Sequence, residues 1–131
     1  MPQAKELNIT EADFDDLIAR VAEEGGDPQV VETIKSAFLG DARLAEVDVQ
    51  GATRRLIIYA LRYGGRGLVW LLKFFSADAA QYVERVRVEL AAYLERHRVW
   101  VVGQLTTFLV VTCGVPRPQA AKIAAKLVDL V

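Results

Sequence analysis

The sequence is poor in the side chains that most often carry chemistry. Its 131 residues include one cysteine, Cys113, and one histidine, His97. A single cysteine excludes an internal disulfide and a cysteine-rich zinc site, and the apolar stretch VVTCGV predicts a buried, inert thiol. His97 lies on the apolar side of YLERHRVW, where the sequence supplies no nucleophile partner. No carboxylates have metal-ligand spacing. We therefore expect no enzymatic activity, no metal and no cofactor.

Long uncharged segments are also scarce. No apolar segment follows the N-terminus, so we expect no signal peptide. The longest uncharged run, residues 99–116, is weakened as a membrane span by Gly103, Gln104 and three threonines. The last segment, PQAAKIAAKLVDLV, carries two lysines and an aspartate, which predicts an amphipathic helix docked on the body. These features predict a cytoplasmic protein without a transmembrane anchor.

Charges of the two signs are unevenly distributed. Residues 1–50 contain twelve acidic and four basic residues, whereas residues 51–131 contain five acidic and twelve basic residues. Such an asymmetry indicates either a membrane or nucleic-acid surface on one half, or two faces that neutralise each other within one fold. The arginines between residues 54 and 66 would form a basic stripe, but that segment is too apolar for a solvated recognition helix. We expect no nucleic-acid binding.

Helical spacing and capping signals together predict seven to eight helices. Thr10 and Asp13 form a capping pair at the start of the first helix, which Gly25-Gly26 ends. Asp27 caps a second helix with Pro28 at its first position. Residues 41–51 predict a brief helix or turn, and further helices are expected over residues 51–63, 66–75, 76–97, 102–113 and 118–131. Strand signals are weak because no hairpin dipeptide separates alternating segments.

The stretch RGLVWLLKFF, residues 66–75, is apolar on nearly every side. A helix of this kind lies either in the centre of a bundle or in lipid. We therefore predict an all-α fold in which residues 1–131 form one globular domain of seven to eight helices around this central apolar helix. Two functions are open at this point: a helix-binding module, and a membrane-active, pore-forming bundle whose acidic first third shields a basic, apolar hairpin over residues 66–113.

The segment TRRLIIYALRYGGRGLVWLLKFF, residues 53–75, resembles the fourth and fifth helices of the Bcl-2 family. Gly65-Arg66 matches the Gly-Arg of the first Bcl-2 homology motif, and the apolar residues up to Phe75 match its continuation. ELAAYLERHRVWVVGQLTTFL resembles the second homology motif, and VVETIKSAFLGDARL resembles the third. The chain departs from the family at Tyr63-Gly64, where the first motif has Asn-Trp, and it lacks the Gly-Gly-Trp of the second motif.

The resemblance implies a compact, virus-like, pro-survival Bcl-2 homologue acting in the cytoplasm or at the mitochondrial surface of a host cell. Such a protein sequesters the amphipathic, death-promoting helices of pro-apoptotic family members in a hydrophobic surface groove. It implies that Arg66 pairs with an aspartate of the partner helix and that Gly65 lets the partner backbone come close. Self-association through the groove and a peripheral membrane contact are further hypotheses.

For the apolar wall of this groove the candidates share helical spacing on the segments that resemble the family. They are Val31, Ile34, Phe38, Leu44, Val47, Ile57, Ala60, Leu61 and Val69. A core stripe and a groove stripe have the same spacing in a sequence, so each of these residues is also a candidate core residue. Arg66 likewise has a second interpretation, as a helix-start arginine whose stem lies on apolar surface and whose head reaches water.

Overall fold

The fold is described here from a computed structural model, which describes residues 7–39 and 49–131. These residues form helices joined by short turns and contain no strand, which confirms the all-α prediction. The helices are α1 (Glu11–Glu23), α2 (Pro28–Leu39), α3 (Val49–Tyr63), α4 (Arg66–Leu72), α5 (Ala77–Arg96), α6 (Val102–Val111) and α7 (Arg117–Leu130). The brief helix or turn expected over residues 41–51 lies mostly outside the described residues.

The helix ends follow the local signals in the sequence. Thr10 Oγ1 accepts a hydrogen bond from the backbone N–H of Asp13 at 3.2 Å, and Asp13 Oδ2 accepts one from the backbone N–H of Thr10 at 3.1 Å. This is the reciprocal capping box that the sequence predicts. Asp27 Oδ1 accepts the backbone N–H of Gln29 at 3.0 Å and so satisfies an unpaired donor at the start of α2. The chain turns near Trp100, because α5 ends at Arg96 and α6 begins at Val102.

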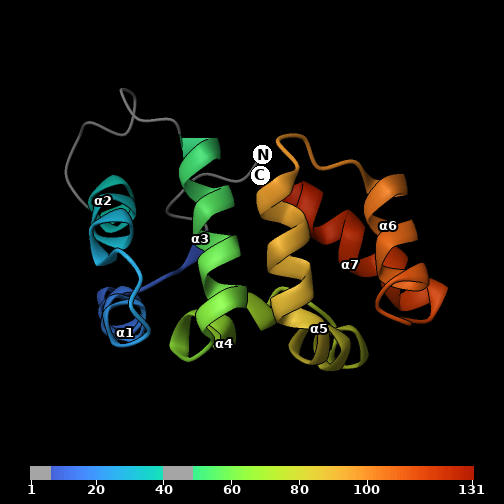
Figure 1. The fold of residues 1–131 in the computed structure, drawn as a ribbon, viewed down its shortest axis with the longest axis horizontal. Coiled ribbons are helices and arrows are strands. Elements are labelled where there is room, and N and C mark those ends of the chain that lie inside the picture. The colour runs from blue at the N-terminus through green and yellow to red at the C-terminus, as the bar shows by residue number, and fades with distance from the viewer. Residues whose placement is uncertain (1–6, 40–48) are drawn as a thin grey trace.

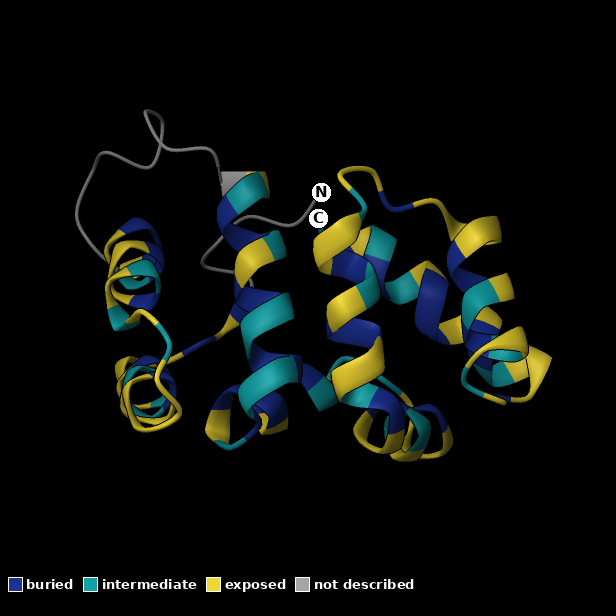
Figure 2. Cartoon of the chain, viewed as in Figure 1, coloured by how far each residue is buried: buried dark blue, intermediate teal, exposed yellow. Residues whose placement is uncertain are grey.

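The helices are arranged along one long axis (Figure 1). The α1–α2 pair lies at one end, α3 and α5 run side by side through the middle, and α6 lies at the other end against α7. The faces that α3 and α5 turn inward are buried, whereas the outer face of α5 is largely exposed and that of α3 is mostly intermediate (Figure 2). The largest fully buried side chains come from six helices: Phe14, Leu17, Leu56, Ile57, Leu61, Leu71, Leu90, Leu94, Leu105, Leu109, Ile123 and Leu127.

The prediction that residues 66–75 form the central helix of the bundle is wrong. The helix ends at Leu72, and the chain turns through residues 73–76 into α5. α4 packs against α1, α3 and α5 through Leu68, Trp70 and Leu71, but Val69 on its other side is 56 % exposed. The middle of the molecule is occupied by α3 and α5 instead. One side of the stretch is core, Val69 is exposed, and Phe74 and Phe75 border surface clefts described below.

Candidate functional site

The candidate site is built around the sharp corner between α3 and α4. Gly64 and Gly65 join the two helices with φ values of 73° and 72°, a left-handed conformation that residues with a side chain rarely adopt. A Cβ atom on Gly65 would also collide with the guanidinium of Arg20 and the carboxylate of Asp16. The two glycines therefore bring the first residue of α4, Arg66, directly onto α1.

Two carboxylates of α1 hold Arg66. The Arg66 Nε–H donates to Asp13 Oδ1 at 3.0 Å, and the Arg66 backbone N–H donates to Asp16 Oδ2 at 3.0 Å. Asp16 Oδ2 also accepts the Nε–H of Arg20 at 2.9 Å. Asp13 thus caps α1 with one oxygen and binds α4 with the other. Both helix starts are tied together at this point.

We call these hydrogen bonds between α1 and Arg66 the clamp; they favour the ionised form of Asp16. Partial burial alone would raise the pKa of the Asp16 carboxyl. The hydrogen bond from the Arg66 backbone N–H, the hydrogen bond from Arg20 and the positive charges of both arginines act in the opposite direction and prevail. The net result is a pKa below the ordinary value of 3.8. Asp16 is therefore a carboxylate at neutral pH and remains a hydrogen-bond acceptor.

A cleft of about 480 Å³ opens beside this clamp. Its apolar lining comes from Leu7, Trp70 and Phe74, and two cations, Arg66 and Lys73, stand in the same lining. The Trp70 indole N–H donates to the Leu7 carbonyl at 2.6 Å, and the Phe74 ring meets the Trp70 ring edge-on with 5.4 Å between centroids. We call this space the Arg66 cleft; its lining also includes Asn8, Thr10 and Asp13.

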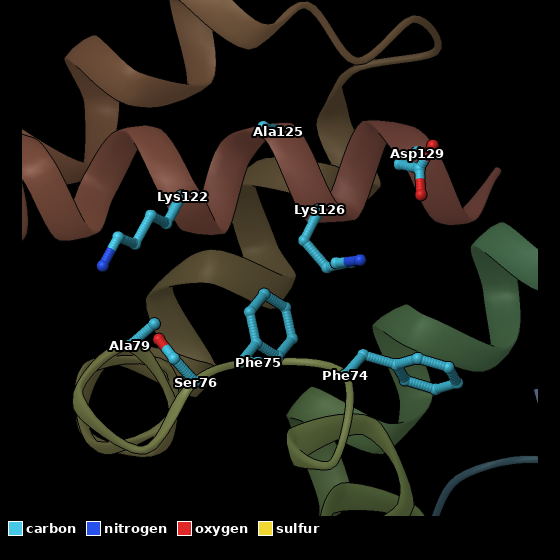
Figure 3. A pocket seen from close by; sticks show the side chains of 8 residues that line it. All are labelled: Phe74, Phe75, Ser76, Ala79, Lys122, Ala125, Lys126 and Asp129. Atoms are coloured by element: carbon cyan, nitrogen blue, oxygen red, sulfur yellow. The ribbon is translucent and has the colours of Figure 1, made fainter.

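A second pocket, of about 460 Å³, lies on the other side of the α4–α5 turn (Figure 3). Lys122 and Lys126 project into it from α7, and the Phe75 ring lies between them. We call it the α7 pocket; Phe74, Phe75, Ser76, Ala79, Lys122, Ala125, Lys126 and Asp129 line it. Phe74 lines the α7 pocket and the Arg66 cleft alike, so the two spaces are neighbours that share an aromatic wall.

The predicted groove wall is divided between core and surface. Six of the candidates have at most 8 % of their surface exposed and are core residues: Val31, Ile34, Phe38, Ile57, Ala60 and Leu61. Their assignment to a partner-binding wall is therefore corrected, because in this structure the core of α1–α5 covers them on all sides. Leu44 and Val47 lie outside the described residues. Val69 is exposed, Gly65 forms the corner, and Arg66 has 57 % of its side chain exposed.

Reasoning from the sequence missed the α1 carboxylates and the α7 lysines as site residues. Asp13 was expected only as a helix cap, although it is also the partner of Arg66, 53 positions away. Lys122 and Lys126 have the i, i+4 spacing that places both on one face of α7, but nothing in the sequence shows that this face meets Phe75. The nearest signal for Phe75 as a site residue was the apolar continuation that the resemblance predicted up to this position.

The basic stripe of α3 is largely engaged within the chain. Arg62 forms an ion pair with Glu95 of α5. An Arg54 Nη–H donates to the His97 carbonyl at 3.0 Å, and the Arg54 guanidinium lies 5.2 Å from the centre of the Trp100 ring. These arginines bind α3 to α5 and to the turn that follows it.

His97 and Cys113, the two side chains first considered for chemistry, both pack against other parts of the protein. The His97 ring stacks on Tyr93 with 4.0 Å between centroids, and its Nδ1 lies 2.7 Å from the Tyr93 carbonyl. Cys113 is half-buried rather than fully buried, and that burial raises the pKa of its thiol. In the described ranges, no three His, Cys, Asp or Glu side chains are grouped as metal ligands would be.

Two further findings bear on function. Among the described residues, no helix is both long enough and apolar enough to cross a membrane. The chain matches no protein-family model, and no curated protein or solved structure is significantly similar to it. The functional argument therefore depends on the geometry of the clefts and on the residues that carry the resemblance.

Proposed function

We propose that the protein is a binding module for an amphipathic helix that carries acidic residues. The observation that carries this proposal is the Arg66 cleft, in which a largely exposed arginine stands beside an apolar wall of Leu7, Trp70 and Phe74. An amphipathic helix binds a groove with an apolar face and fixes its register with polar contacts at the edge. The cleft offers both kinds of contact within one turn of α4.

Arg66 is suited to the polar contact. Its Nε–H is bound to Asp13, while a guanidinium has five N–H donors in a planar fork. A carboxylate of a partner could share this fork or replace Asp13, as the resemblance implies for the aspartate of a death-promoting helix. Lys73 lines the same cleft, and Lys122 and Lys126 line the pocket beyond Phe74. These four cations outnumber the two carboxylates of the same linings, Asp13 and Asp129, and so favour an acidic partner.

In its finer form the proposal follows the resemblance. The partner helices would be those of pro-apoptotic Bcl-2 family proteins, and the protein would act as a pro-survival regulator of apoptosis at the mitochondrial surface. Arg66 would keep the role that the resemblance gives it, whereas Gly65 and Val69 do not line the cleft. The apolar floor, however, would be Leu7, Trp70 and Phe74, because the expected wall on α2 and α3 is core.

The test is calorimetric titration of the whole chain with peptides that span the death-promoting helix. We expect submicromolar binding to at least one peptide and a loss of about tenfold or more on Lys73→Glu and on Arg66→Glu. Lys73→Glu is the cleaner variant because Lys73 is exposed, whereas Arg66→Glu also sets a third carboxylate beside Asp13 and Asp16.

The matched control is Arg117→Glu, an exposed arginine at the start of α7 that lines neither space. It makes the same change of charge, and we expect it to alter affinity by less than about twofold. Silence across the panel, or an equal loss in the control, would reject the proposal. The alternative function, a pore-forming bundle, predicts leakage from vesicles without any peptide.

A further inference from the structure

α6 and the turn before it carry four exposed valines, three at the N-terminal end of the helix and one at its C-terminal end. Val99 is 73 % exposed, Val111 is 75 % exposed, and Val101 and Val102 are 45 % and 39 % exposed. α6 packs mainly against α7, through a buried side that includes Leu105 and Leu109. The side of α6 away from these leucines is exposed and carries Gln104 and Thr107 as well as Val111. Exposed apolar side chains gathered on a surface mark contact surfaces.

The two threonine hydroxyls of α6 are satisfied within the helix. Thr106 Oγ1 donates to the Val102 carbonyl at 2.7 Å, and Thr107 Oγ1 donates to the Gly103 carbonyl at 3.0 Å. A hydroxyl bound in this way can enter an apolar environment at a lower cost than one that loses water without a replacement. No charged residue occurs between Arg98 and Arg117.

The charge of this part of the sequence is of one sign. Residues 96–128 contain five basic residues and no acidic one. Arg96 and Arg98 precede the exposed valines in the sequence, Arg117 follows them, and all three are exposed. At the opposite end of the long axis, residues 7–39 contain eight acidic and two basic residues. The molecule is therefore electrically polarised, with its apolar, basic end at α6 (Figure 1).

We propose that the α6 face is a docking surface for an anionic lipid bilayer. The valines of this face enter the region between headgroups and acyl chains, and the flanking arginines bind lipid phosphates and carboxylates. α6 lies along the interface, because ten residues are far too few to cross the hydrocarbon core. Repulsion between the lipid charge and the acidic α1–α2 end turns that end away from the membrane.

Charge also decides against a second copy of the chain as the occupant. A symmetric dimer through α6 would set the same arginines of two copies against each other across the interface. Like charges opposed in this way disfavour association, whereas an anionic bilayer complements them. This inference does not depend on the Arg66 cleft, which lies between α1 and α4.

The test is co-sedimentation of the whole chain with vesicles of phosphatidylcholine alone and of phosphatidylcholine mixed with phosphatidylserine. We expect binding to the mixed vesicles only, weakened by added salt. The double variant Val99→Ser with Val111→Ser should lower binding about tenfold, because it removes apolar contact without changing charge. Arg117→Gln should lower it severalfold through charge alone.

The matched control is Val88→Ser, since Val88 is a valine of α5 that is 54 % exposed and lies outside the α6 face. It should bind the mixed vesicles as the unchanged chain does. Equal binding by the double variant, or no binding to the mixed vesicles, would overturn the proposal. Dye release would overturn it in favour of insertion, and a lipid-free dimer lost in the double variant would assign the face to a second copy.

Discussion

Two apolar stretches of similar appearance are packed differently in this protein. RGLVWLLKFF becomes α4 and the turn after it, and α4 is packed against α1, α3 and α5. VGQLTTFLVV becomes α6, which packs mainly against α7 and leaves Val102 and Val111 exposed. The difference is not one of hydrophobicity but of the number of neighbouring helices. Whether an apolar side chain is buried depends on the elements around it, so an apolar segment alone does not show that its residues are buried.

The comparison predicts its largest effect for truncation of one leucine of α4. Leu71 is fully buried, so Leu71→Ala should lower the free energy of unfolding by about 2–5 kcal/mol through lost contact and a residual cavity. Val111→Ala on α6 should change it by less than about 0.5 kcal/mol, because that side chain is 75 % exposed. Chemical denaturation of both variants measures the difference. Equal losses would show that α6 is covered in solution.

A smaller effect is expected at the glycines of the two regions. Gly65→Ala should cost about 1–3 kcal/mol, because its φ is 72° and a Cβ would strike Arg20 and Asp16. Gly103→Ala has open space around the new methyl group and a helical position, so it should be neutral or stabilising by up to about 1 kcal/mol. Thermal or chemical unfolding tests the pair; a neutral Gly65→Ala would mean that the α3–α4 corner rearranges easily.

The helices themselves were largely predictable because their signals are local. The capping box of Thr10 and Asp13, the Asp27-Pro28 start of α2 and the turn at Gly64-Gly65 each act within four residues, and the structure places helix ends there. The extent of α4 was not predictable in the same way. Its apolar pattern continues through Phe75, and only the packing of α3 against α5 removes it from the centre.

The site was less predictable than the fold, since it depends on which helix faces meet. Val31, Ile34 and Ile57 have the helical spacing expected of a groove wall, but they are buried in the core. The sequence contains nothing that distinguishes a groove residue from a core residue at these positions. Asp13 and Arg66 are joined across 53 positions, a pairing that no local pattern carries. Arg66 was identified through the resemblance, but its partner inside the chain was found only in the structure.

The smallest predicted effect concerns Asp78, whose contacts with Gln119 and Lys122 join α7, and with it α6, to the start of α5. Hydrogen bonds from Ser76 and Gln119, together with the charge of Lys122, lower the pKa of Asp78 to about 2. A lowered folded pKa means that the stabilisation is complete above the ordinary value of 3.8 and is lost as the pH falls through about 2. Ser76→Ala removes the largest cause.

In that variant we expect the midpoint of the Asp78 carboxyl titration, followed by nuclear magnetic resonance, to rise toward 3.8. Stability at neutral pH should hardly change, because Ser76 and Asp78 are both exposed. Ser36→Ala on the exposed side of α2 is the control and should leave the midpoint unchanged. An unaltered midpoint in Ser76→Ala would show that the hydroxyl does not bind Asp78 in solution.

The hydrogen bond from Trp70 to the Leu7 carbonyl has an optical consequence. The chain has two tryptophans, both nearly buried: Trp70 on α4, and Trp100 in the turn before α6, whose indole donates to the Leu94 carbonyl at 3.3 Å. Each region therefore contains its own fluorophore. In a Trp100→Phe variant, emission comes from Trp70 alone, and a shift to longer wavelength reports release of the segment before α1. A Trp70→Phe variant reports the α5–α6 turn, so the two ends can be followed separately.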